Sequence, residues 1–221
     1  MNQLQSLFSN NNLLVQALTH KSWVNEHKGQ RESNERLEFL GDAVLELIVS
    51  AEIYRRFPDK PEGYLTALRA SLVNTQHLAG VAAKLDVGER LFLSKGEEAT
   101  GGRRNKSLLA DTVEAIIGAL YLDQGLEACK KLIREYLITD IAEKVKTPLK
   151  DAKSMLQELV QNRRLKAPIY KVIKSIGPDH AKTFTVEVEI DGKAVASAAG
   201  TNKAEASQKA AKMALLQLTK K

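Results

Sequence analysis

Apolar residues recur every three or four positions along most of the first 146 residues, the spacing of helices that bury one face. Proline and glycine interrupt this pattern at Pro58 and Gly125, where helices are expected to stop. No stretch in this part shows a convincing strand pattern. Helices are therefore predicted over Ser33–Phe57, Pro61–Leu85, Ser107–Asp123 and Leu126–Lys144.

One segment of this first part lacks helical periodicity. Residues 94–106 hold three glycines and four basic side chains. Glycine disfavours helix and basic side chains favour solvent. The sequence therefore predicts an exposed loop here, which either contacts a ligand through Arg103 and Arg104 or is simply a surface loop.

The pattern changes after residue 146. Residues 183–190 alternate polar and apolar, as a half-buried strand does, and Asp191-Gly192 then gives a strong hairpin signal. Further strands are predicted at 169–176 and 193–199, with a helix at 151–162 before them. Thr201 or Asn202 can cap a final helix. Its apolar stripe is expected to consist of Ala206, Ala210, Met213, Ala214 and Leu218.

These patterns predict two domains. An all-α domain is expected over residues 1–146 and a small α-β-β-β-α domain over 151–221, with 147–150, which contain Pro148, as a linker. The charge separates in the same way. Residues 1–146 carry 19 Lys+Arg and 20 Asp+Glu, whereas residues 147–221 carry 14 and 7. The basic second domain suggests a polyanion as partner, because neutralised phosphates release counterions; a generic solubilising surface is the alternative.

Several classes of protein are excluded. No apolar run approaches the roughly 18 residues of a membrane span, and the N-terminus does not resemble a secretory signal, so a soluble cytoplasmic protein is expected. The single cysteine, Cys129, excludes an internal disulfide framework. The four histidines lack zinc-ligand spacing, and there is no phosphate-binding loop for a nucleotide cofactor.

The most informative feature is a set of carboxylates on otherwise apolar helices. Residues 108–122 contain only two charges, Asp111 and Glu114, which are three apart and share a helical face. Glu35, Glu38 and Asp42 share a face of the earlier helix in the same way. Isolated buried carboxylates are unfavourable, so both helices require compensating cations.

Three interpretations of these acids compete. They can form buried salt bridges, with Arg36 or Arg69 as candidate partners; they can be a carboxylate pair for acid–base chemistry; or they can hold a hard metal ion such as Mg²⁺. Two clusters on two apolar helices favour the metal. Carboxylate-bound Mg²⁺ close to a polyanion-binding domain points to phosphodiester chemistry.

The two acidic segments resemble a known family. Glu35-Arg36-Leu37-Glu38-Phe39-Leu40-Gly41-Asp42-Ala43 is similar to the signature of ribonuclease III, and residues 109–118, Leu-Ala-Asp-Thr-Val-Glu-Ala-Ile-Ile-Gly, resemble its second acidic motif. The last 70 or so residues resemble a double-stranded-RNA-binding domain. The order of the two domains matches that of the bacterial enzymes.

The resemblance implies site residues. Glu38, Asp42, Asp111 and Glu114 match the four metal-site acids of the family, and Asp42 and Glu114 match the pair usually called catalytic. Glu35 and Glu62 match two further acids near the cleavage site across a dimer interface. Gly41 would allow a close approach of two helices, and Phe39 and Leu40 are expected to be core or dimer contacts.

The second domain has candidate contacts to an RNA duplex, which proteins read through 2′-hydroxyls and phosphates. Gln157 and Glu158 are expected to reach one minor groove, and the segment with Pro178 and His180 a second. A lysine at the start of the last helix, with two more further along it, suits phosphates across the major groove. These RNA-binding candidates are Lys203, Lys209 and Lys212. Ala204 and the neighbourhood of Ser207 lack basic residues that the family usually has.

The resemblance implies a homodimeric, Mg²⁺-dependent endoribonuclease specific for double-stranded RNA, in which Mn²⁺ can replace Mg²⁺. Its products would have 5′-phosphate and 3′-hydroxyl ends and short 3′ overhangs, and its substrates would include precursors of ribosomal RNA and other structured transcripts. The alternative is a non-catalytic RNA-binding protein that keeps the nuclease fold. That alternative gives no reason for all four metal-site acids to be present.

Overall fold

The computed structural model describes residues 4–139, 141, 145, 151–178 and 182–219. The chain divides into two compact units, Met1–Leu149 and Lys150–Lys221. The predicted linker at 147–150 lies outside the described residues. No helix in the described part of the chain is both long and apolar enough to cross a membrane.

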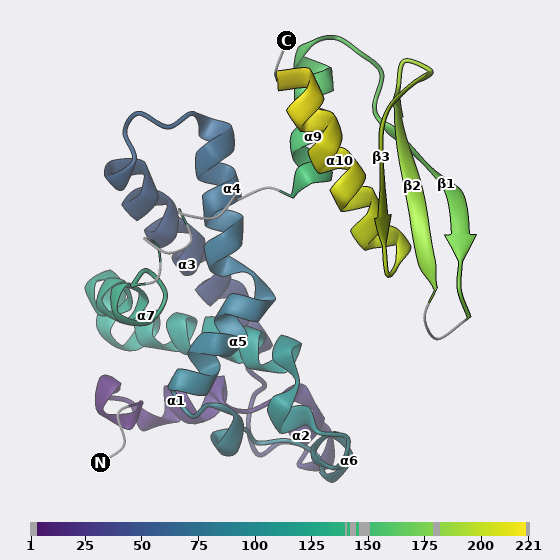
Figure 1. Cartoon of the computed structure of the whole chain (residues 1–221). Coiled ribbons are helices and arrows are strands. Elements are labelled where there is room, and N and C mark those ends of the chain that lie inside the picture. The colour runs from purple at the N-terminus through teal and green to yellow at the C-terminus, as the bar shows by residue number, and fades with distance from the viewer. Residues whose placement is uncertain (1–3, 140, 142–144, 146–150, 179–181, 220–221) are drawn as a thin grey trace. The chain divides into compact units, whose positions relative to one another are not determined.

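The first unit is helical, as predicted (Figure 1). Its regular elements are η1 (Gln5–Leu7), α1 (Asn11–Ala17), α2 (Lys21–Glu26), α3 (Glu35–Arg56), α4 (Glu62–Val73), α5 (Thr75–Lys84), η2 (Gly88–Arg90), α6 (Lys95–Ala99), η3 (Gly102–Arg104) and α7 (Lys106–Tyr136). An isolated bridge between Thr19 and Phe92 adds a short extended pairing.

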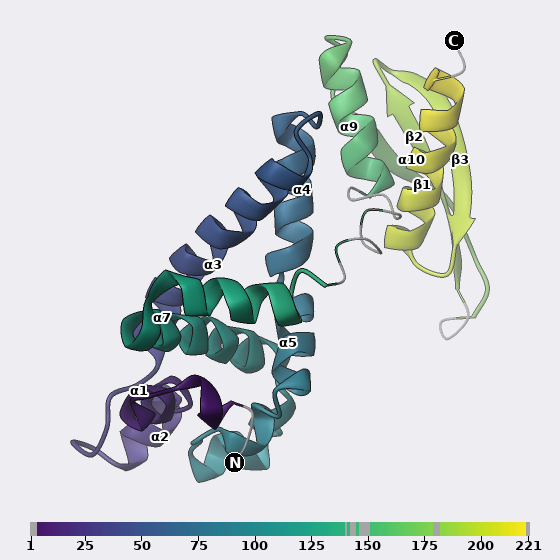
Figure 2. The same cartoon turned by 90° about the vertical axis from the view of Figure 1, so that its left-hand side faces the viewer.

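Helices α3 and α7 pack more extensively against each other than any other helices of this unit do, and they lie side by side in both views (Figures 1 and 2). Each helix buries a continuous apolar face, which explains why the sequence period identified both. The buried residues of the two helices include Leu37, Val44, Leu45, Ile48, Val49, Val113, Ala115, Ile116, Ile117 and Leu120.

The single helix predicted over Pro61–Leu85 is in fact two helices. Asn74 adopts an extended conformation between α4 and α5, and its side chain accepts a hydrogen bond of 2.9 Å from the backbone N–H of His77. Asparagine favours such caps, so a local side-chain contact overrides the continuous apolar period. Pro61 itself lies just before the first residue of α4, as its cap.

The loop predicted over residues 94–106 contains two short helical elements, α6 and η3. The Ser94 hydroxyl caps α6 by accepting from the N–H of Glu97, and Gly101 supplies a left-handed turn with φ 86°. The Arg103 guanidinium bonds Glu98 at 2.6 Å and the carbonyl of Gly88 at 3.0 Å. Arg103 is thus a structural residue, whereas Arg104 is exposed.

Helix α7 is kinked where the sequence predicts a break. Gly125 has φ 78° and ψ −172°, which are not helical values, and helical structure resumes immediately after it. The second part ends at Tyr136, before the expected end near Lys144. Residues 142–144 lie outside the described part of the chain.

The second unit has the predicted α-β-β-β-α order. Helix α9 (Ala152–Asn162) precedes an antiparallel sheet in the order β1 (Ile169–Ile176), β2 (Thr183–Ile190) and β3 (Lys193–Gly200), and α10 (Lys203–Thr219) follows. Both helices cover one face of the sheet (Figures 1 and 2). The predicted fold class, a helical domain followed by a small α+β domain, is confirmed.

The hairpin turn and the helix cap predicted in this unit are both present. Asp191 and Gly192 have φ values of 49° and 75°, as expected for a tight hairpin turn between β2 and β3. Asn202, one of the two predicted caps, accepts from the N–H of Glu205 at 2.9 Å. Met213 is 45% exposed, so its place in the apolar stripe was wrong. Ala211 is buried on α10 instead, so the buried face is turned toward Ala211 and away from Met213.

Candidate metal centre and RNA-binding surface

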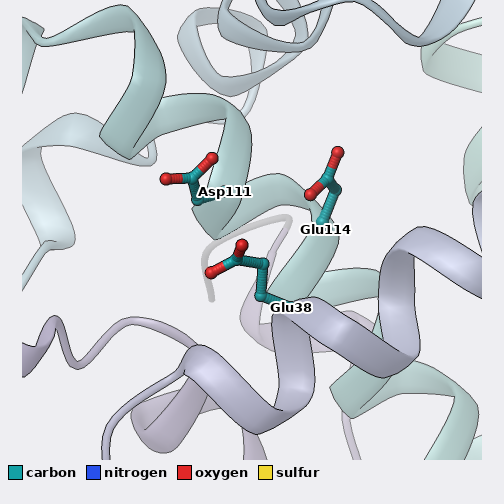
Figure 3. A group of neighbouring side chains, drawn as sticks. All are labelled: Glu38, Asp111 and Glu114. Atoms are coloured by element: carbon teal, nitrogen blue, oxygen red, sulfur yellow. The ribbon is translucent and has the colours of Figure 1, made fainter.

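Three of the predicted acids come together where α3 and α7 meet. Glu38 of α3 and Asp111 and Glu114 of α7 each offer a carboxylate oxygen, and these oxygens all lie within 4.8 Å of one another. Figure 3 shows the three carboxylates converging from the two helices. All three side chains are half-buried. This group, called the acidic triad below, has the all-oxygen donor set that hard divalent cations prefer.

Two glycines bring the helices close enough to form the triad. A Cβ atom at Gly41 would clash with the backbone carbonyl oxygen of Glu114, and one at Gly118 would clash with the carbonyl oxygen of Leu37. The backbones of α3 and α7 are therefore in direct contact one turn away from the carboxylates. This confirms the expectation that Gly41 allows a close helix approach.

The pKa values of all three triad carboxyls lie above their ordinary values. Burial, followed by the charges of Asp42, Asp111 and Glu38, raises the pKa of Glu114 to about 7. Burial is also the largest cause that raises the pKa of Glu38 and that of Asp111. A divalent cation would remove this repulsion.

The salt-bridge interpretation is wrong for the triad within the residues that the structure describes, although Glu35 does pair with Lys21. Arg69 instead pairs with Glu46, with 3.0 Å between Nε and Oε2, and donates to the Ser50 hydroxyl. Arg36 is exposed. Within the described part of the chain, no lysine, arginine or histidine forms an ion pair with a member of the triad.

Asp42, the fourth predicted ligand, lies beside the triad rather than within it. It is exposed on α3, one turn after Glu38, and is not among the carboxylates that lie within 4.8 Å of one another. Its charge is nevertheless the largest cause, after burial, that raises the pKa of Glu114. Asp42 therefore lies at the solvent side of the centre.

The two further acids, Glu35 and Glu62, are outside the triad. Glu35 begins α3, pairs with Lys21 at 3.2 Å and accepts from the Ser33 hydroxyl at 3.1 Å. The hydrogen bond from Lys21 is the largest cause that lowers the pKa of Glu35. Glu62 begins α4 and accepts from the Thr66 hydroxyl at 2.7 Å.

Lys21 was missed as a neighbour of the acids by the sequence analysis. No periodic spacing relates α2 to α3, so only the tertiary structure brings Lys21 and Glu35 together. Its charge is among those that lower the pKa of Glu38 and of Asp111.

The predicted RNA contacts of the second unit lie on its surface. Gln157 and Glu158 are exposed on α9, and Pro178 is exposed after β1. His180 lies outside the described residues. The exposed lysines of α10 are Lys203, Lys209 and Lys212.

The neighbours of these lysines differ. Lys203 is the first residue of α10. Lys209 forms an ion pair with Glu205 at 2.7 Å. The hydrogen bond from Lys209 is the largest cause that lowers the pKa of Glu205 to about 2. Ser207 is buried and donates to the carbonyl of Lys203, so a cation could not replace it without disturbing the core. Ala204 is exposed and is therefore the surface position that lacks a charge.

An acidic triad on two touching helices, followed by an α-β-β-β-α unit with a basic last helix, defines a nuclease joined to an RNA-binding domain. Two family models agree with this class. Residues 10–141 match a model described as Ribonuclease-III-like, and residues 152–218 match the double-stranded RNA binding motif. The chain belongs to the ribonuclease III family.

Similar proteins cover nearly the whole chain. A Ribonuclease 3 from Natranaerobius thermophilus is 46% identical over 97% of this chain and 93% of its own length. One from a Geobacillus species is 47% identical over 96% of this chain and 86% of its own length. The solved nuclease domain of ribonuclease III from Campylobacter jejuni is 43% identical, with a TM-score of 0.55, over 60% of this chain and 92% of that domain.

Proposed function

We propose that this endoribonuclease of double-stranded RNA cuts both strands of the duplex with Mg²⁺ held by the acidic triad and Asp42. The single observation that carries the proposal is the convergence of Glu38, Asp111 and Glu114, none of which forms an ion pair in the described part of the chain. The resemblance of residues 35–43 and 109–118 to the family's acidic motifs supports the same assignment.

The donor set fits Mg²⁺ or Mn²⁺ better than softer metals, because carboxylates are hard oxygen ligands and the described site offers neither sulfur nor imidazole. When bound, Mg²⁺ would favour ionisation of a water molecule and offset negative charge on the leaving oxygen. Glu38 and Asp111 would hold the metal. Asp42 and Glu114 would hold it and orient the attacking water, which places 5′-phosphate and 3′-hydroxyl ends on the products.

A second copy of the chain is needed to cut both strands, because the described part of one chain has a single triad. Helix α3 offers a surface for that copy. Its large apolar side chains Phe39, Leu47 and Tyr54 are 82%, 59% and 72% exposed, and their spacings of eight and seven place them along one stripe. The nuclease domain from Campylobacter jejuni has a region involved in dimer formation. We therefore expect a homodimer that pairs through this stripe and leaves short 3′ overhangs.

The second unit would bind the duplex without reading its sequence. Gln157 and Glu158 on α9 and Pro178 and His180 after β1 would reach two minor grooves. Lysines of α10 would contact phosphates of the intervening major groove, and the net charge of residues 147–221, 14 basic against 7 acidic, supports that role. The proposed substrates are structured cytoplasmic transcripts, including precursors of ribosomal RNA, messenger RNA and transfer RNA.

One incubation tests this function. Purified protein is mixed with a long RNA duplex, or with single-stranded RNA of the same sequence, with and without Mg²⁺. We expect the duplex alone to be cut, only with Mg²⁺, into pieces that accept ligation at their 5′-phosphates. Binding of the duplex without cleavage at any Mg²⁺ or Mn²⁺ concentration would instead favour the alternative, a non-catalytic RNA-binding protein.

A further inference from the structure

Lys21 lies at the first position of α2, beside the acids of the proposed nuclease centre. Its Nζ atom is 3.2 Å from Glu35 Oε1, and the two side chains are 61% and 54% exposed. Its charge also acts on Glu38 of α3 and Asp111 of α7. Lys21 thus carries a solvent-accessible ammonium that contacts Glu35 and acts through its charge on two members of the triad, although it forms no ion pair with the triad itself in the described part of the chain.

The backbone that carries Lys21 is fixed on both sides. The His20 N–H donates to the carbonyl of Phe92 at 3.1 Å, and His20 Nδ1 accepts from the N–H of Ser22 at 3.2 Å. The Ser22 hydroxyl oxygen accepts from the N–H of Ser94 at 3.0 Å. The start of α2 is therefore anchored to residues 92–94.

The same turn is tied to the helix that carries the acids. The Thr19 carbonyl accepts from the backbone N–H of Asn34, the residue before α3, at 2.9 Å, and Thr19 is fully buried. The Asn34 side chain donates to the carbonyl of Ala17 at 3.3 Å. The turn that precedes Lys21 is therefore attached by hydrogen bonds to the residue before α3.

A lysine here has opposite effects on the two charged species that the centre would bind. Its ammonium repels a divalent metal ion, so it opposes metal binding to the free protein. A phosphate anion that enters the centre would instead be stabilised by a charge-assisted hydrogen bond from the same ammonium. Since Glu35 is exposed, its bond to Lys21 can be exchanged for a bond to phosphate without burying an unpaired charge.

We propose that Lys21 is a catalytic residue: on duplex binding its ammonium leaves Glu35 and donates a hydrogen bond to a non-bridging oxygen of the phosphate that is cut. Lys21 transfers no proton in this step and offsets the negative charge that develops on that phosphate. The inference rests on the proposed function, because it requires the triad to be the cleavage centre.

The test compares Lys21→Met and Lys21→Arg with Lys130→Met. Lys130 forms a similar ion pair with Glu127, at 2.6 Å on α7, and serves as the matched control. Single-turnover cleavage is measured at saturating Mg²⁺ and duplex. We expect Lys21→Met to be about 10- to 100-fold slower, Lys21→Arg to recover part of that loss, and the control to match the unmodified protein.

A second measurement uses no RNA. Binding of Mn²⁺ to the free protein, followed by electron paramagnetic resonance, should become about two- to fivefold tighter in Lys21→Met, because a repelling charge has been removed. The control should bind Mn²⁺ as the unmodified protein does. Slower cleavage together with tighter metal binding is the combination that a purely structural role for Lys21 would not produce.

The outcomes separate the two proposals. If the unmodified protein does not cut duplex RNA with Mg²⁺, the proposed function fails, and the role of Lys21 fails with it. If that protein cuts but Lys21→Met cuts equally fast, only the role of Lys21 is overturned. Weaker Mn²⁺ binding in Lys21→Met would also overturn it, since the slower cleavage would then arise through the metal. Thermal melting verifies that each variant is folded. If Lys21→Met does not fold, Lys21→Arg tests the proposal, because it keeps the charge and changes the position of the donor.

Discussion

Replacing Glu114 by glutamine separates the metal interpretation from a structural one. Glutamine keeps the size of the side chain and removes its charge. Burial and the neighbouring carboxylates raise the pKa of Glu114 to about 7, so above that pH its ionised form opposes folding. We expect Glu114→Gln to stabilise the metal-free protein at pH 8.

The magnitude and its pH dependence follow from linkage. Because the folded state binds the proton of Glu114 more tightly than the unfolded state, stability falls as the pH rises from about 4.5 to about 7 and then levels off. A rise of the pKa from 4.5 to about 7 corresponds to about 3 kcal/mol, of which solvent screening leaves about 2 kcal/mol. The melting temperature of the variant should then exceed that of the unmodified protein by about 4–8 °C at pH 8, and by little at pH 4.5.

Thermal melting in excess chelator, at both pH values, measures this difference. Glu127→Gln, an exposed position on the same helix, is the matched control and should show no such gain. Mg²⁺ should then raise the melting temperature of the unmodified protein more than that of Glu114→Gln, because a ligand that binds only the folded state stabilises it. Cleavage by Glu114→Gln should fall by orders of magnitude, whereas duplex binding in a gel-shift assay should persist.

The opposite result would refute this reasoning. A buried salt bridge to Glu114 predicts that the variant loses about 3–5 kcal/mol, because an unpaired cation would remain. A destabilised Glu114→Gln protein that still cleaves at low temperature would therefore remove Glu114 from the metal centre.

Three further predictions concern the metal, the RNA-binding unit and the helix contact. Mn²⁺ should replace Mg²⁺, and Ca²⁺ should support duplex binding with little cleavage; full activity in excess chelator would contradict the metal assignment. A fragment of residues 1–146 should dimerise and cut duplex RNA at low salt, but it should no longer cut near physiological salt. If its cleavage depended on salt concentration as that of the full chain does, the second unit would have no role in binding. Gly41→Ala should destabilise the protein by about 3 kcal/mol or more by thermal or chemical unfolding, whereas Gly80→Ala, in open space on α5, should not. Equal stabilities of these two variants would show that α3 and α7 can separate at no cost.

Elements that bury a regular face could be predicted from the sequence, and elements decided by single side chains could not. The long apolar period of α3 and the alternation of β2 both arise from a regularly buried face. The kink of α7 was marked by a single glycine, Gly125, at the end of such a period. The break at Asn74 depends on one cap that a continuous period hides. The short helix α6 depends on Ser94 and Gly101, in a segment whose glycines and charges are typical of a loop.

The two faces of α10 show a subtler limit. The helical spacing that identified Ala206, Ala210 and Ala214 as core residues also admits Met213, since residues three and four apart share a face. A larger apolar side chain gains more from burial, so hydrophobicity alone favoured Met213. The fully buried residues that α10 contributes to the core are small, whereas Met213 is 45% exposed. Burial there is decided by how close the helix lies to the sheet, which the pattern does not specify.

The acid site was predictable because its residues conflict with their surroundings. Carboxylates at helical spacing on apolar helices are unfavourable unless they have a common purpose. In the structure Glu38, Asp111 and Glu114 lie together in one group. The pattern could not give the distance between the helices, which Gly41 and Gly118 determine. Without that backbone contact the carboxylates would lie too far apart to share an ion, and each would be more readily hydrated. The two glycines therefore do more than permit packing: they bring Glu114 to a position where burial, and then the charges of Asp42, Asp111 and Glu38, raise its pKa to about 7. Under the proposed function, a divalent cation would neutralise these charges.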